Sequence, residues 1–190
     1  MPFIFENLDE TTRQYMRQEF DLDVANNALY VDRRLNDEGM AHYATLLRTA
    51  IEGHDEVWLA EQLRPYLNSS EERRTTSGGT TIAKVPIGAH QTLAESEFNR
   101  FYIRGLCSRA IAEGIESVEV YRGKEVGQPR PTSQAKIGQQ LAVLPLLHDL
   151  RTAPGMDSIS GLAAPNSGLT VRLPRREEVV TTATPYDVGK

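Results

Sequence analysis

The run from Ala94 to Gly114 constrains the fold more than any other stretch of the chain. Its large apolar side chains recur at helical spacing, and Gly114 stands where a left-handed residue commonly closes a helix. Residues 116–123 then follow, where Val118 and Val120 alternate with Glu119 and Tyr121, as side chains do in a half-buried strand. The pattern predicts a helix, a glycine turn and a strand that pack one face of each element together. The apolar face of the helix would comprise Phe98, Phe101, Tyr102, Leu106, Ala110 and Ile111, with Cys107 inside it.

The start of this helix and three helices before it are marked by capping signals. Thr92 and Glu95 have the spacing of a capping box, which predicts a start near Leu93. Upstream, residues 6–21 and 36–53 carry helical apolar spacing, with Asn7 and Asn36 as the expected caps and Gly53 as the left-handed closing residue of the second. A third, shorter helix should end at Pro65, which cannot continue the hydrogen-bond ladder.

A polar stretch separates these helices from the rest of the chain. Residues 68–81 contain no apolar side chain, so nothing there offsets the entropy of ordering the backbone. We expect a 1–67 N-terminal helical region, a 68–82 polar loop or linker, an 83–174 α+β core region and a 175–190 extended C-terminal tail. Together they should form one compact domain of 190 residues.

The later part of the core region is punctuated by Gly138 and Pro145. Two short helices are expected there, the second with Pro145 in its first turn. Residues 168–173 read as a last short strand. The predicted fold class is therefore α+β, mainly helical, with a few short β-strands and extended loop and C-terminal segments.

The motifs needed for several kinds of chemistry are missing from the sequence. One cysteine excludes an intramolecular disulfide and a cysteine-cluster zinc site, and no two histidines stand three or four residues apart. Phosphate-loop, dinucleotide-binding and serine-nucleophile motifs are absent, and Glu119 and Lys124 have the wrong spacing for a strand-borne nuclease pair. Cys107 lies well inside its helix and is expected to be a buried small hydrophobe. We therefore assign no catalytic residue, no metal ligand and no cofactor. The sequence does not decide whether the protein is an enzyme, and it favours a protein that is not one.

The net charge and the hydropathy of the chain bear on whether it binds nucleic acid or membranes. The net charge of -5 does not favour nucleic acid, and no run approaches the ~20 apolar residues of a membrane span. No secretory signal is recognised, so a cytoplasmic protein without membrane contact is expected.

One cluster of basic residues is a candidate binding site. If the helix packs on the strand, an anion-binding rim would form from Arg100, Arg104, Arg122, Lys124 and Arg130. The alternative is an ordinary solvated rim of salt bridges to Glu95, Glu97 and Glu113.

The tail supplies the leading functional hypothesis. Residues 175–190 carry balanced charges and few large apolar side chains, and Val179, Val180 and Tyr186 are the expected partner-binding residues. Such a segment gains order against a partner, for example by adding a strand to an exposed sheet edge. The sequence therefore favours a structural or assembly protein that makes homo-oligomers or binds other subunits, such as a component of a phage or virus-like particle. The alternative hypothesis is a nuclease or nucleotide-binding protein that handles nucleic acid or phosphate through the basic rim.

Overall fold

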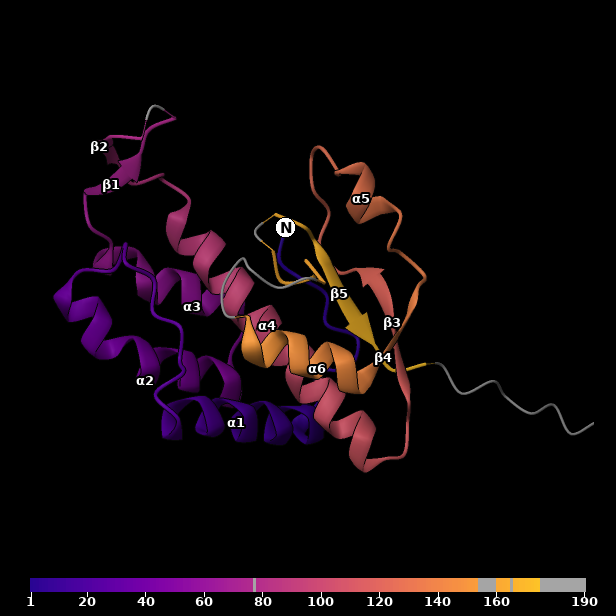
Figure 1. Ribbon diagram of the computed structural model, residues 1–190. Helices are drawn as coiled ribbons and strands as arrows, with labels where there is room; N and C mark the ends of the chain where they lie inside the picture. Colours follow the sequence, from indigo (N-terminus) through magenta and orange to yellow (C-terminus); the bar gives the residue numbers. More distant parts are fainter. Residues whose placement is uncertain (77, 154–159, 165, 175–190) are drawn as a thin grey trace, which may run out of the picture.

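One long helix organises the structure, a computed structural model that describes residues 1–76, 78–153, 160–164 and 166–174. This helix, α4 (Ala89–Ala112), runs through the middle of the molecule (Figure 1). Helices α1 (Glu10–Ala25) and α3 (Glu56–Leu63) pack against it, as does α6 (Val143–Thr152). Two small antiparallel sheets complete the described residues. The prediction of a mainly helical α+β fold is confirmed.

The interior of α4 matches the predicted apolar face except at Ile111, which is 41% exposed. Phe98, Phe101, Tyr102 and Cys107 are all fully buried, and Gly114 adopts the left-handed conformation with φ of 71°. The helix nevertheless begins at Ala89, before the predicted start, and Gly88 caps it without a side-chain hydrogen bond. The expected capping box is not what starts this helix, and the carboxylate of Glu95 pairs instead with Lys124.

The caps of the first two helices agree only in part with the predicted ones. Asn36 Oδ1 accepts a hydrogen bond from the Gly39 amide at 2.7 Å at the start of α2 (Asp37–Gly53), as predicted. The cap of α1 is Asp9 rather than Asn7, because Asn7 Oδ1 accepts a hydrogen bond from the Leu173 amide. A short-range signal therefore misassigned a side chain that serves a long-range contact. Gly53, expected to be left-handed, is the last residue of α2, and His54 caps it in an extended conformation.

The stretch expected to be a polar loop contains a β-hairpin. Strands β1 (Ser70–Arg74) and β2 (Thr80–Lys84) pair in antiparallel register, and a 3-10 turn, η1 (Arg64–Tyr66), precedes them. Charge rather than apolar burial supports the hairpin, since Glu71 binds Arg34 at 2.7 Å and Arg73 at 2.5 Å. The expectation of a loop was wrong because it counted only apolar surface.

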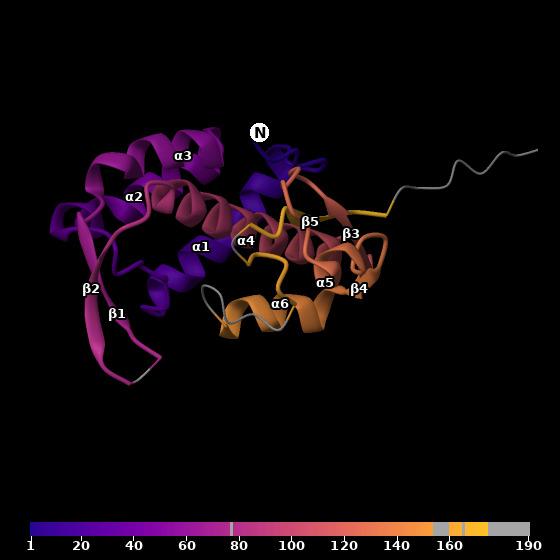
Figure 2. The same ribbon diagram turned by 90° about the horizontal axis from the view of Figure 1, so that it is seen from above.

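The second sheet has the order β4-β3-β5, with β3 (Ser117–Arg122) between β4 (Gln140–Ala142) and β5 (Leu169–Arg172). Val118 and Val120 of β3 are fully buried. Tyr121 lies on the other face, where the N-terminal segment covers it: its hydroxyl donates to the Ile4 carbonyl at 2.6 Å. Both views place this sheet and the β1–β2 hairpin at opposite ends of the molecule (Figures 1 and 2).

The segment between β3 and β5 contains the second of the two predicted short helices, α6, and Pro145 lies in its first turn as expected. In place of the first, the structure has the four-residue turn α5 (Pro131–Gln134) and the strand β4. Leu146, Leu147 and Leu150 of α6 are buried against the rest of the protein. Helix α6 thus covers α4 on the side away from α3 (Figure 2).

Candidate functional site

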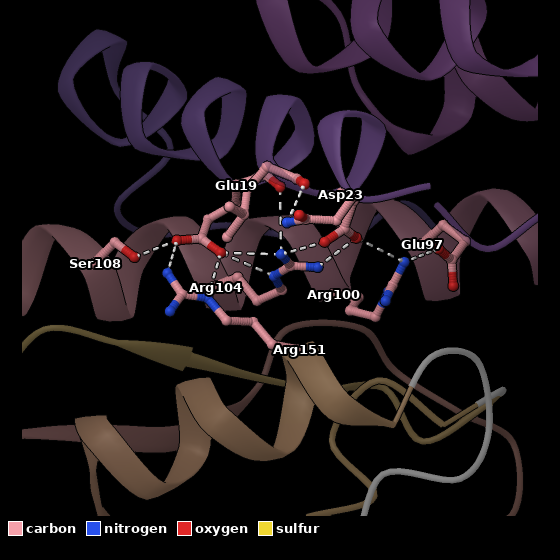
Figure 3. A network of polar contacts seen from close by, with 9 residues as sticks. Glu19, Asp23, Glu97, Arg100, Arg104, Ser108 and Arg151 are labelled. Carbon is pink, nitrogen blue, oxygen red and sulfur yellow. Dashed lines mark hydrogen bonds and ion pairs between the residues drawn. The ribbon is translucent and has the colours of Figure 1, made fainter. Parts of the chain in front are cut away.

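Arg104, expected on an anion-binding rim, is instead fully buried between α1 and α4. Its two terminal nitrogens donate to the two carboxylate oxygens of Asp23 at 2.7 and 2.8 Å. Its Nε donates to Glu19 Oε2 at 3.1 Å (Figure 3). Such a forked, charge-assisted arrangement occupies the donors that a solvent anion would need.

Glu19 connects this pair to a third helix. Its carboxylate accepts hydrogen bonds from Arg151 of α6 at 2.5 and 2.9 Å and from the Ser108 hydroxyl at 2.7 Å (Figure 3). Burial raises the pKa of Glu19, but the bonds from Arg151 and Ser108 and the charge of Arg104 outweigh it and bring the pKa below its usual value. The charged form of Glu19 is therefore the one that holds α1, α4 and α6 together.

Arg100 is also buried and paired. It binds Glu97 at 2.7 Å and approaches Asp23 at 3.8 Å. Burial raises the pKa of Glu97 despite the neighbouring Arg100. The centroid of the Phe101 ring lies 5.0 Å from the guanidinium carbon of Arg100 and 5.0 Å from that of Arg104, which is within the range of cation–π contacts. We call Glu19, Asp23, Glu97, Arg100, Arg104 and Arg151 the ionic network.

The other residues of the expected rim lie elsewhere. Lys124 pairs with Glu95, and Arg122 donates to the Gln134 side chain at 2.9 Å. Arg130 is exposed at the start of α5. The structure therefore does not gather the five residues on one surface, because Arg100 and Arg104 face the interior. The three acids named as alternative partners all form ion pairs: Glu95 with Lys124, Glu97 with Arg100 and Glu113 with Arg109.

Cys107 has the environment of a structural cysteine. It is fully buried, and burial raises the pKa of its thiol to about 12. A thiol with so high a pKa carries almost no thiolate near neutral pH, and the thiolate is the reactive form.

An exposed apolar surface lies where β4 runs into α6. Leu144 is 66% exposed and Ile111 is 41% exposed. Two hollows of about 440 and 420 Å³ flank this junction and share Ala142 and Pro145. We call this surface the apolar corner; it comprises Ile111, Ile115, Leu141, Ala142, Leu144 and Pro145.

The apolar corner adjoins an edge strand. Gln139 accepts a hydrogen bond from the Val120 amide and Val143 donates one to Glu116, so these residues face β3. In an antiparallel ladder successive residues alternate in direction, so the amides of Gln140 and Ala142 point away from β3. Only two short helices, and no interaction surface, were expected from the sequence in this part of the chain. The missed signal is that the run from Ala142 to Leu147 has more apolar residues than one helix face can bury.

The remaining predicted site residues, Val179, Val180 and Tyr186, lie outside the described residues. None of the helices in the described part of the chain combines the length and the apolar composition needed to cross a bilayer. Within the same residues, no group of three or more histidine, cysteine, aspartate or glutamate side chains is arranged to hold a metal ion.

No protein-family model, curated protein or solved structure matches this chain.

Proposed function

We propose that this protein is a non-enzymatic assembly component that binds a second copy of itself through the apolar corner. The observation that carries the proposal is the exposed apolar surface beside the open edge of β4. Contiguous exposed apolar surface on a protein marks interaction sites more often than single exposed residues do. An open edge adds backbone donors that an extended segment from another chain can use.

The course of the chain supports a partner of the same kind. Strand β5 ends with Arg172 opposite Glu119, and the neighbour of Glu119 on the other side is Gln140 of β4. The last residue of β5 therefore lies level with Gln140, the first residue of the edge strand β4. In a two-fold dimer each copy could place residues 175–190 on the edge of the other, since two-fold interfaces are self-complementary.

The tail sequence suits this use. The stretch Glu178–Thr184 contains β-branched residues that favour extended pairing, and Val179, Val180 and Tyr186 supply apolar side chains for the corner. The assembly is proposed to form in the cytoplasm, which the single cysteine fits. A subunit of a phage or virus-like particle is one form that such an assembly would take.

Sedimentation equilibrium tests the proposal with two matched charge substitutions. Leu144→Glu introduces a charge into the apolar corner and should convert the oligomer to a monomer without changing the melting temperature. Ile87→Glu is the control, because Ile87 is 96% exposed and lies outside the corner. A monomeric wild-type protein at every concentration, or an equal effect of the two substitutions, would remove the case for self-assembly through this surface.

A further inference from the structure

Two hollows lie side by side where the first turns of α4 meet α3 and the loop after β3. The outer hollow has a volume of about 420 Å³ and is lined by Glu56, Val57, Arg64, His90 and Gln91, among others. The inner hollow has a volume of about 20 Å³ and is lined by Ser96, Asn99, Ser167 and Gly168, among others. Glu95 and Lys124 line both hollows. Neither hollow touches the apolar corner, so this inference is independent of the proposed assembly role.

The inner hollow has a buried acceptor that the protein does not satisfy. Asn99 is only 1% exposed, and its Nδ2 donates to the Leu169 carbonyl at 2.9 Å, which fixes the orientation of the amide. Asn99 Oδ1 and Ser96 Oγ are buried and have no hydrogen-bond partner among the described residues. An amide oxygen can only accept a hydrogen bond, so Asn99 requires a donor, whereas the serine hydroxyl can donate or accept.

Charge and size limit what that donor can be. An ammonium group would meet Lys124, and a carboxylate or phosphate would meet Glu95, while these two residues already neutralise each other in an ion pair. A volume of about 20 Å³ has room for a group the size of one water. The group must therefore be uncharged, be about the size of one water and donate a hydrogen bond to Asn99. A hydroxyl group meets these conditions, and it can also accept a hydrogen bond from Ser96.

The outer hollow is also lined by groups that can donate or accept hydrogen bonds. Glu56 is 2% exposed and accepts a hydrogen bond from the Phe3 amide at 2.7 Å, and burial raises its pKa. Burial and the charge of Arg64 lower the pKa of His90, which favours neutral imidazole. Several donors and acceptors thus converge around a space within the ordinary range for small-molecule sites, with Val57 as part of its apolar wall.

We propose that the two hollows form one binding site for a neutral polyhydroxylated small molecule of the monosaccharide class. One hydroxyl enters the inner hollow and bonds to Asn99 Oδ1 and Ser96 Oγ. The ring occupies the outer hollow, where its other hydroxyls meet Glu56, Arg64 and Gln91. The Glu95–Lys124 ion pair lines both hollows and therefore lies beside the ring where its hydroxyl enters the inner hollow.

Ligand-observed NMR and calorimetry on the full-length protein test this site with D-glucose, D-galactose, D-ribose and myo-inositol at millimolar concentration. D-glucosamine and D-gluconate serve as cationic and anionic comparators. At least one neutral compound should bind saturably and more tightly than both charged ones. No saturable binding would mean that the inner hollow holds water only, and tighter binding of a charged comparator would contradict the argument from charge.

Matched substitutions then locate the bound compound. Ser96→Ala removes a hydroxyl that has no protein partner, and it should weaken binding about tenfold, because it leaves a ligand hydroxyl unpaired. Thr170→Val is the control, since Thr170 Oγ1 is also buried without a partner but lines neither hollow. Equal affinities for wild type and Ser96→Ala, with both variants folded by circular dichroism, would overturn the assignment.

Discussion

Arg104 illustrates what a fully buried charge requires of its neighbours. Replacing it with methionine should lower the free energy of unfolding by about 3–5 kcal/mol, because Glu19 and Asp23 would remain buried without their main counter-ion. Urea denaturation at neutral pH measures this change. The matched substitution Arg48→Met breaks exposed pairs with Asp21 and Glu52 and should cost less than about 1 kcal/mol. Similar losses in the two variants would show that burial does not determine how much these ion pairs contribute to the free energy of unfolding.

Glu56 should make the folded protein less stable at neutral pH than it would be with a neutral side chain at this position. Burial raises its pKa above the ordinary value near 4.5, so the stability it contributes is complete at lower pH and is lost as pH rises through the folded-state pKa. Glu56→Gln keeps an acceptor for the Phe3 amide and removes the charge. We expect the variant to melt above wild type at pH 7 and at the same temperature at pH 3.

Glu19 supplies the comparison of opposite sign. Its pKa is lowered, so its contribution is present above the unfolded-state pKa and disappears as pH falls through the folded-state value. Glu19→Gln should therefore melt below wild type at pH 7, and the two should converge in acid. Melting curves from pH 3 to pH 7 that move in the same direction for Glu19→Gln and Glu56→Gln would contradict these assignments.

Among the elements, α4 depends most on its aromatic residues. Phe101 is fully buried, contacts Phe20 at a centroid distance of 5.9 Å and makes cation–π contacts with Arg100 and Arg104. Phe101→Ala should lower the free energy of unfolding by about 3–5 kcal/mol, because it leaves a cavity and removes both cation–π contacts. Chemical denaturation measures the loss. Ile111→Ala, on the exposed side of the same helix, should cost far less.

Periodicity and turn chemistry predicted the elements that follow local rules. The long helix, the glycine turn after it, the strand at residues 117–122 and the Asn36 cap are all confirmed, because each depends on residues close together in the chain. The pairing of residues 70–74 with residues 80–84 was missed, because Glu71 in the first of these strands is held by Arg34, far away in the sequence. The burial of Arg100 and Arg104 was missed for the same reason, since Asp23 and Glu19 lie on another helix. A helix with charged residues on one face looks solvated until its partners are known.

At the scale of the whole molecule, the contacts that hold the fold together lie away from the proposed interface. The ionic network joins α1, α4 and α6 in the interior (Figure 3). The aromatic residues of α4 are also buried. The apolar corner and the open edge of β4 lie at the surface, on the outer side of the sheet. Stability and association should therefore respond to different substitutions.

Deleting residues 175–190 separates these two properties most directly. The buried core of the described part of the chain is formed by residues between Met16 and Val171, and the balanced charges of the tail provide no strong attraction to a domain of net negative charge. We expect the truncated protein to melt within a few degrees of wild type and to lose most of its oligomer in sedimentation experiments. A substitution of Val179 and Val180 by serine should reproduce the loss, because it removes the side chains proposed to cover the apolar corner while keeping the length. If the truncation unfolds the protein, the tail belongs to the fold. If every association persists, the corner binds its partner without the tail, and the proposed exchange of tails between copies is wrong.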